Sequence, residues 1–426
     1  MRSKISIILG ERLVLVLCST FIFGLSFNLL KVARDCALTC TIPSAIVPLA
    51  ILVTSIFSLP AMLLHTLESR FGKFKWILGN LIFAGFALMA FRIILLLLTS
   101  NGTTYTNTGH VTDTAVVYFL FFIFVSAYFS IVLSYNAFDT VYIAFPPSQR
   151  KQPLIYATAA LMAGGLLGSY SSRYLNPFMF EMFEKVYSLW LDPITYAVLS
   201  LLLGVPVIVR FFHLGYLTLN SNDKLPRIGL LTRTWWIWQE PKLRHMGFFF
   251  LTQGMVDAIG KCMMYLLIIQ LTDMAVDGRT SLFSNLYAWL NIASLIIVAF
   301  GVERLFKSFG MKLSLIFMPA VLLCTAFVLR FVPSIVVLMT WKITEGTLSA
   351  SLQNPGQNQL LLKIGENKTQ LIRPLMRGFL GRLGEGLGAG MVLICFFIQG
   401  SDVTTVVVNL YIASLVMWLI SIAALR

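Results

Sequence analysis

The chain has 426 residues, of which 58% are hydrophobic and 12% are charged, and its mean hydropathy is +0.84. Soluble domains carry about a quarter of their residues as charges, so this composition excludes an ordinary soluble protein and predicts a polytopic membrane protein. A helical span needs about 20 apolar residues, and a chain of this length accommodates about twelve such spans with short loops.

Apolar segments of that length recur along the whole chain. We expect an all-α membrane protein with spans near residues 13–32, 43–65, 76–99, 115–137, 153–171, 191–212, 246–269, 282–302, 313–331, 335–353, 374–398 and 405–425. The longest polar stretch separates the first six spans from the last six. We therefore predict an N-terminal six-helix bundle over 1–212, a cytoplasmic connecting loop over 213–245, and a C-terminal six-helix bundle over 246–426.

Basic residues are distributed unevenly between alternate loops. With the N-terminus inside, the cytoplasmic segments hold about 21 Lys and Arg and the outer loops about 3, a strong positive-inside bias. This bias predicts cytoplasmic N- and C-termini, and we expect the protein to lie in a bacterial inner membrane. It also accounts for the formal net charge of +14. We expect no nucleic-acid partner, because no basic stripe interleaves with aromatic residues.

The cysteines and histidines favour neither a metal site nor a cofactor site. Of the six cysteines only Cys36 and Cys40 lie close in sequence, at helical spacing, and the four histidines are scattered near span ends. A structural metal site needs several such ligands together. We interpret the cysteines as small apolar residues and expect no metal and no cofactor.

Charged residues lie inside or at the ends of several spans, where they usually face a polar cavity or a partner. Asp257 and Lys261 are one helical turn apart in the seventh span, share a face and could pair. The further candidates are Lys31, Arg34 and Asp35 in the first span, and Arg373, Arg377, Arg382 and Glu385 in or beside the eleventh. Basic residues outnumber acidic ones in this set. It therefore indicates a path for an anion, and arginine suits phosphate through its bidentate hydrogen bonds.

Other interpretations of the charges stay open. Lys342 and Glu345 in the tenth span are secondary candidates, because they lie near its cytoplasmic end and could be ordinary rim residues. Any one pair could also be a structural salt bridge between helices. The glycines of the fifth and eleventh spans predict close helix packing, with a moving gate as the alternative.

Two short basic loops at matched positions, Glu68–Lys75 and Glu303–Lys312, resemble the loop between the second and third helices of major facilitator transporters. Such proteins consist of two parallel six-helix halves around a central site. Both matched loops follow the second span of their half. The resemblance therefore implies a major-facilitator-like fold.

Three charged segments resemble the nucleotide (ATP/ADP) translocases of plastids and obligate intracellular bacteria. They are Leu29–Asp35 in the first span, Met255–Lys261 in the seventh and Gly381–Ala389 in the eleventh. The glycine run Gly164–Ser169 is also similar. Four positions depart from the family pattern: Arg34 stands where lysine is usual, Asp257 stands where Glu is common, Glu385 replaces a lysine, and Arg377 replaces an aspartate. The fourth span also lacks the acidic residue of the family. These departures concern the substrate more than the fold.

The resemblance implies exchange of ATP and ADP, or nucleotide uptake, by alternating access. Another organic or phosphorylated anion is the alternative cargo. The expected substrate-binding residues are Lys31, Arg34, Asp35, Asp257, Lys261, Arg373, Arg377, Arg382 and Glu385. The cations would hold phosphates, and Asp257 and Glu385 would release them by re-pairing with the freed cations. A counter-substrate, or a proton taken by Asp257, would couple the cycle.

We expect partners limited to a small anion and the lipid bilayer, and a monomeric protein. An enzyme acting on lipid phosphates is the alternative of a different class, but such enzymes show clustered Asp or His for acid–base or metal chemistry. No such cluster lies at a span mouth in this sequence. A scaffold without transport activity is a further alternative. We therefore predict a transporter and not an enzyme.

Overall fold

The computed structural model describes most of the chain as helix. The described residues are 2–66, 73–100, 113–133, 140–141, 144–145, 149, 151–181, 193–213, 239–272, 274, 276–300, 302–362, 372, 374–399 and 403–425. They contain no strand. Where a π-helical segment continues an α-helix, the two are counted here as one. On that count the described residues form twelve long helices, which confirms the predicted all-α membrane fold.

The chain divides into two compact units, each built from segments of both halves of the sequence. The first comprises residues 1–41, 63–224 and 274–295, and the second comprises residues 42–62, 225–273 and 296–426. Most of α2 therefore belongs to the second unit, and most of α11 to the first. The bundles predicted over 1–212 and 246–426 divide the sequence into two halves, and this division stays a prediction.

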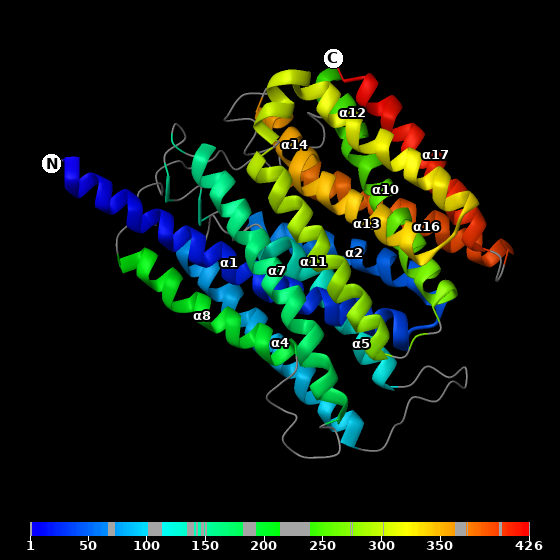
Figure 1. Ribbon diagram of the computed structural model, residues 1–426, viewed down its shortest axis with the longest axis horizontal. Helices are drawn as coiled ribbons and strands as arrows, with labels where there is room; N and C mark the ends of the chain where they lie inside the picture. The colour runs from blue at the N-terminus through cyan, green and yellow to red at the C-terminus, as the bar shows by residue number, and fades with distance from the viewer. Residues whose placement is uncertain are drawn as a thin grey trace. The chain divides into compact units, whose positions relative to one another are not determined.

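The first unit is organised around one long helix, α1. Its helices are α1 (Arg2–Thr41), α4 (Lys73–Ser100), α5 (Asp113–Ile123) with its π-helical continuation η2 (Phe124–Leu133), α7 (Lys151–Glu181), α8 (Pro193–His213) and most of α11 (Val276–Phe300). Helix α1 packs along α7 and α8, and α4 packs on α8 (Figure 1). Apolar side chains of α1 such as Leu29 and Leu30 are buried in the hydrophobic core of this unit.

The second unit is organised around α10. Its elements are η1 (Ser44–Ile46), most of α2 (Val47–Thr66), α10 (Pro241–Leu271), α12 (Val302–Phe331), α13 (Ile335–Leu348), η5 (Ser349–Gln353), α14 (Asn354–Leu362), η6 (Pro374–Leu380), α16 (Gly381–Gln399) and α17 (Val403–Ala423). Helix α10 packs on α16 and α17, while α12 packs on α13 and α17. Segments η5 and η6 are π-helical. Short π segments inside α-helices often occur at functional sites.

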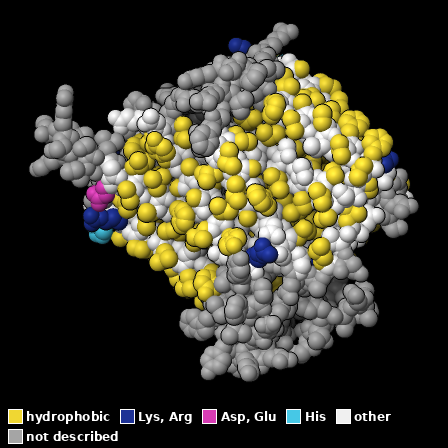
Figure 2. Space-filling model, viewed as in Figure 1, with side chains coloured by type: hydrophobic (Ala, Val, Ile, Leu, Met, Phe, Trp, Pro, Cys, Tyr) yellow, Lys and Arg dark blue, Asp and Glu magenta, His cyan; other side chains and the backbone are white. Residues whose placement is uncertain are grey.

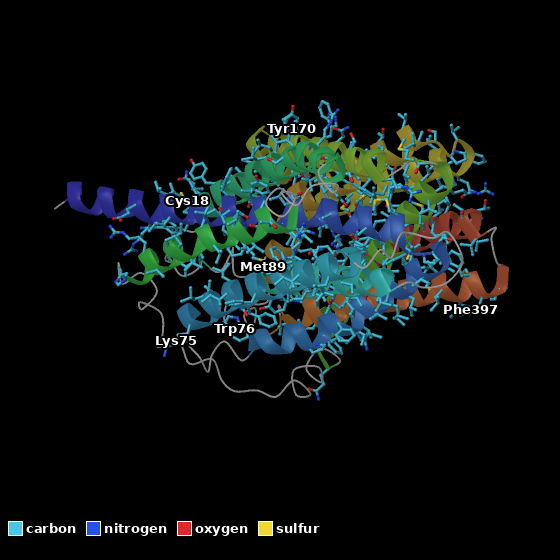
Figure 3. The ribbon with its side chains drawn as sticks, turned by 90° about the horizontal axis from the view of Figure 1, so that it is seen from below. Cys18, Lys75, Trp76, Met89, Tyr170 and Phe397 are labelled. Atoms are coloured by element: carbon cyan, nitrogen blue, oxygen red, sulfur yellow. The ribbon has the colours of Figure 1, made fainter. Side chains whose placement is uncertain are left out.

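Seven helices are long and apolar enough to cross a membrane, judged by length and composition over the described residues. Large apolar side chains point away from the helix bundles, for example Phe86, Phe331 and Phe397, which are 73%, 76% and 84% exposed. On the face drawn in Figure 2 the described side chains are mostly hydrophobic. Figure 3 places Tyr170 and Phe397 on the outside of their helices. Such a surface suits lipid.

The structure describes the two basic loops predicted at matched positions to different extents. Residues 67–72 of the first lie outside the described residues. In place of the second loop, α12 already begins at Val302 and is broken at Gly310, where φ is +71°. Only glycine adopts that conformation at little cost, which explains why the helix breaks at this residue. Gly310 is also the glycine of the predicted turn.

Glycines bring the backbones of two helix pairs into close contact. On α7, a Cβ at Gly164 would lie 2.0 Å from the carbonyl oxygen of Phe21 on α1. On α16, a Cβ at Gly384 would lie 2.0 Å from the carbonyl oxygen of Leu251 on α10. Small residues four apart allow such close packing in membranes. The predicted packing role is confirmed at these glycines, whereas a Cβ at Gly390 would meet nothing within 4 Å.

Candidate functional sites

The first unit buries an ion pair near the C-terminal end of α1. The Asp35 carboxylate is fully buried and accepts a hydrogen bond from Arg34 Nε at 2.6 Å. Its other oxygen accepts from the Tyr287 hydroxyl of α11. Arg34 also donates to the Ser126 hydroxyl of η2 at 3.2 Å. A carboxylate can stay charged without water when cations and hydroxyl groups satisfy it in this way, so Asp35 ties α1 to α11.

Lys31 lies one turn before this pair and faces aromatic rings. Its Nζ is 3.9 Å from the centroid of the Tyr287 ring and 6.0 Å from that of Phe27. An ammonium over an aromatic face is stabilised by the ring quadrupole, although less strongly than by a full negative charge. The cluster of Lys31, Arg34 and Asp35 thus carries two cations and one anion.

Amides and hydroxyls extend this cluster along α1. Asn291 of α11 donates to the Asn28 side-chain oxygen at 3.3 Å, and Asn28 donates to the Gly24 carbonyl at 3.0 Å. The close approach depends on Gly165 of α7, where a Cβ would lie 2.6 Å from Asn28 Nδ2. Tyr287, Asn28 and Asn291 were missed in the sequence analysis, because uncharged polar residues in a span are common.

The second unit buries a larger cluster on α10, α13 and α16. Lys261 Nζ donates to Glu385 Oε1 at 3.2 Å, and Arg382 donates to Glu385 Oε2 at 2.6 Å. The predicted partner of Lys261 within its own helix was Asp257. The structure instead pairs Lys261 with Glu385 on α16, since helix packing brings that carboxylate to the ammonium. Glu385, only 8% exposed, therefore joins both cations.

Asp257 lies among these charges. No described residue forms a hydrogen bond or an ion pair with its carboxylate. Lys261, Lys342, Glu345 and Glu385 are the charged groups close enough to act on it. A carboxylate in such surroundings can exchange partners without first breaking a bond of its own.

Of the secondary candidates, Lys342 is buried, Glu345 is half-buried, and the two are paired. Lys342 Nζ lies 2.6 Å from Glu345 Oε2, with side chains 10% and 16% exposed. Lys342 also lies beside the Trp341 ring, which packs edge-on against Tyr411. This pair belongs to the same α10–α13–α16 cluster and does not lie at an exposed rim.

Amide side chains continue the cluster along α10. Gln253, Asp257 and Lys261 follow one another at intervals of four residues and so form one stripe on that helix. Gln357 of α14 donates to the side-chain oxygen of Gln253. Gln353 in η5 is fully buried, and its side-chain amide nitrogen and oxygen form no hydrogen bond with any described residue. The regular spacing of 253, 257 and 261 was the sequence signal that could have found this stripe.

The basic residues before α16 are only partly described. Arg377 of η6 donates to the Asn354 side-chain oxygen at the start of α14. Arg373 lies outside the described residues. The described residues contain no group of three or more His, Cys, Asp or Glu side chains that could hold a metal ion.

The two units repeat one arrangement. In α1 the crossing with α7 involves Phe21, Gly24 and Leu25, and in α10 the crossing with α16 involves Leu251, Gly254 and Met255 in the same roles. Both sets are related by a shift of 230 positions in the sequence, and the same shift relates Lys31 to Lys261. Each unit therefore places a lysine two turns beyond its glycine crossing. Tandem repeats of this kind are typical of transporters with two parallel halves.

Comparison with known proteins supports the fold. No family model matches the chain, and no curated protein matches its sequence. Among solved structures, a bacterial homologue of the human lysosomal transporter Spinster, inward-facing and unoccupied, is similar with a TM-score of 0.56 and 13% identity, covering 97% of this chain and 95% of that one. The nucleoside transporter NupG is similar with a TM-score of 0.60 and 12% identity, covering 97% of this chain and 98% of that one.

These similarities extend over nearly the whole chain at low identity, so they establish its fold. The chain has a major-facilitator-like fold, as the sequence predicted. The narrower resemblance to nucleotide translocases stays a prediction.

Proposed function

We propose that this protein is an integral membrane transporter of nucleotides such as ATP and ADP, working by alternating access. The observation that carries the proposal is the repeated lysine. Lys31 and Lys261 occupy equivalent places beyond equivalent glycine crossings, inside helices that otherwise suit lipid. Charged residues are expensive at such positions and usually mark a substrate or ion pathway.

The charge of the first cluster supports an anionic cargo. Among the described residues, Lys31 and Arg34 face one carboxylate, Asp35, in the first unit. In the second, the cations Lys261, Lys342 and Arg382 equal the carboxylates Asp257, Glu345 and Glu385 in number, and Arg377 lies just before α16 in the sequence. The excess of cations in the first cluster suits a negatively charged cargo. Arginine adds bidentate hydrogen bonding to phosphate oxygens.

Glu385 supplies a means of release. It holds Lys261 and Arg382 in this structure, and an arriving phosphate would compete with it for both. When the cargo leaves, Glu385 recovers both cations, so neither is left uncompensated in a site of low dielectric constant. Asp257 offers Lys261 a second carboxylate one turn away. In this mechanism the two carboxylates alternate with the cargo as partners of Lys261.

Coupling would come from a counter-nucleotide or from a proton on Asp257. Asp257→Asn keeps the shape of the side chain and removes its charge. If a proton on Asp257 couples the cycle, this variant loses the pH dependence of uptake but retains exchange of labelled for unlabelled cargo. Unchanged uptake with unchanged pH dependence would contradict the coupling role.

A competition panel tests the cargo. Uptake of labelled ATP into proteoliposomes is measured with excess ADP, AMP, adenosine, inorganic phosphate, a sugar phosphate or a dicarboxylate outside. Competition by ATP and ADP alone supports nucleotide transport. Stronger competition by one of the other anions would replace nucleotides by the alternative cargo class, another organic or phosphorylated anion.

Substitutions of arginine or lysine inside and outside the cluster test whether uptake depends on the cluster or on positive charge in general. Lys261→Gln and Arg382→Gln remove cations that bind Glu385, and we expect each to lower uptake at least tenfold. Arg330→Gln removes a half-buried arginine of α12 that donates a hydrogen bond to Asn409, and we expect uptake to persist. Equal losses in all three variants would argue against a specific site.

We also propose the orientation that the basic loops predict, with both termini in the cytoplasm of a bacterial cell and the protein in the inner membrane. Reporter fusions that are active on one side of the membrane only, placed after Arg426 and before Met1, test this. Activity of either fusion on the outer side would overturn the orientation and leave the fold unaffected.

A further inference from the structure

Two thiols lie side by side on the last turns of α1, next to the first charged cluster. Cys36 Sγ and Cys40 Sγ are 3.8 Å apart, and neither residue is in a disulfide. Residues four apart in an α-helix have Cα atoms about 6 Å apart, within the range that disulfides span, but their Cβ atoms are about 5–6 Å apart and a disulfide needs about 3.5–4.5 Å. Closure therefore requires the last turn of α1, which ends at Thr41, to bend or unwind. The remaining cysteines, Cys18, Cys262, Cys324 and Cys395, lie on other turns or other helices.

Helix α11 supplies the surroundings of both thiols. The Thr280 hydroxyl lies 2.9 Å from Cys36 Sγ. The Arg279 guanidinium donates to the carbonyl oxygen of Thr39 and also hydrogen-bonds the Cys40 thiol. Cys36 is 4% exposed, whereas Cys40 is partly exposed. A guanidinium next to an accessible thiol stabilises the thiolate, which is the reactive form.

We propose that Cys36 and Cys40 form a redox-modification site that closes to a disulfide within α1 by exchange with a small disulfide such as oxidised glutathione. This site is independent of the proposed cargo. The geometry assigns the first attack to Cys40, because Cys40 is the more exposed thiol and has Arg279 beside it.

The exchange is balanced in two steps. The Cys40 thiolate attacks one glutathione sulfur, which forms a mixed disulfide and expels one glutathione thiolate. Cys36 then attacks the Cys40 sulfur, which forms the internal disulfide and expels the second glutathione thiolate. The protons of both cysteines end on the two expelled thiolates, and two electrons pass from the protein to the oxidant.

Closing the disulfide changes the contact between α1 and α11. The sulfur separation must fall from 3.8 Å to the length of an S–S bond, about 2.05 Å. Cys36 then has no S–H, and its interaction with Thr280 is lost or weakened. Asp35, which holds Tyr287 of α11, is the adjacent residue. The modification therefore acts on the segment of α1 that ties α11 to the first unit.

The first test uses a variant in which Cys36 and Cys40 are the only cysteines. The purified protein is equilibrated with mixtures of reduced and oxidised glutathione and quenched with acid. Its intact mass is then measured by mass spectrometry. We expect the mass to fall by two hydrogen atoms and to recover with dithiothreitol. Thiols that stay reduced, or a stable adduct of glutathione, would overturn the proposal.

A matched pair tests whether the surroundings matter. Leu383 and Leu387 have the same spacing on α16, and both are exposed. In a chain without its native cysteines, L383C/L387C should need a several-fold higher ratio of oxidised to reduced glutathione, despite the greater exposure. Closure of both pairs at the same ratio would show that spacing alone suffices and would overturn the assigned role of α11.

Two single substitutions complete the test. Arg279→Gln in the two-cysteine variant should slow closure several-fold, because Cys40 loses its cation. Thr280→Val should speed closure, because Cys36 is no longer held. Effects of opposite sign would contradict the mechanism. If the two-cysteine variant does not fold, peptide mapping of the oxidised native chain tests the proposal instead. A Cys36–Cys40 disulfide would support the proposal, and its absence would overturn it.

Discussion

Lys261 of α10 binds Glu385 of α16 across 3.2 Å, although Asp257 lies one helical turn from Lys261 on the same helix. Glu385 also accepts from Arg382 at 2.6 Å. One carboxylate thus neutralises two cations from two helices, and Asp257 is left beside them. This arrangement determines which substitutions in the second unit should lower the stability of the folded protein.

Glu385→Gln should destabilise the protein, because it leaves Lys261 and Arg382 without their shared carboxylate. Removing one partner of a fully buried pair costs about 3–5 kcal/mol. Lys261 is 38% exposed, so we expect a smaller loss of about 2 kcal/mol. The thermal unfolding midpoint in detergent measures it. In Lys261→Gln/Glu385→Gln the loss should be less than the sum of the single losses, and additive losses would show that the pair is not coupled.

Tyr287→Phe should weaken the first unit, because the buried Asp35 carboxylate loses a hydrogen-bond donor. An unsatisfied buried acceptor costs about 1–3 kcal/mol. The thermal unfolding midpoint should fall accordingly. Tyr156→Phe, at a position 48% exposed on α7, is the control and should leave the midpoint unchanged. Equal effects of the two variants would mean that the Tyr287–Asp35 contact does not hold α11.

Gly384→Ala should disrupt the crossing of α10 and α16, because the new Cβ would lie 2.0 Å from the carbonyl oxygen of Leu251. Overpacking of this kind costs about 1–3 kcal/mol. Gly390→Ala, two turns along the same helix, meets nothing within 4 Å and should be neutral or slightly stabilising, since alanine favours helix. If both variants lower the unfolding midpoint equally, the glycines act through helix flexibility and not through packing.

Gln353→Met should raise the unfolding midpoint, because the substitution removes two buried polar atoms that have no hydrogen-bond partner among the described residues. Relief of such a group is worth about 1–3 kcal/mol. Gln357→Met removes the donor to Gln253 and should lower the midpoint. A fall in the Gln353 variant as well would indicate that Gln353 is satisfied in solution, by water or by another arrangement of η5.

The helices and their order were predictable from the sequence, because a span must be long and apolar to satisfy its backbone inside a bilayer. The predicted span 335–353 corresponds to α13 with η5, and 374–398 corresponds to η6 with α16. The charged candidates Arg34 and Asp35, and likewise Lys261, Arg382 and Glu385, meet within their units as their positions suggested. The ends of α1 were less predictable, since that helix extends well beyond its apolar stretch.

Partner choice within each cluster was not predictable from sequence spacing. Asp257 and Lys261 have ideal spacing for a pair, yet the crossing at Gly254 and Gly384 brings Glu385 to Lys261 instead. Tyr287 contacts Asp35 only because α11 packs on the first unit, which no local pattern indicates. The repeat that relates Lys31 to Lys261 became visible from the glycine crossings, because the side chains around the two lysines differ.

The most direct test of the proposed function is uptake of radiolabelled ATP into proteoliposomes with and without ADP inside. The account predicts uptake that requires internal ADP and that falls at least tenfold in Lys261→Gln. The absence of ATP uptake from correctly inserted, folded protein, under both conditions, would contradict nucleotide transport.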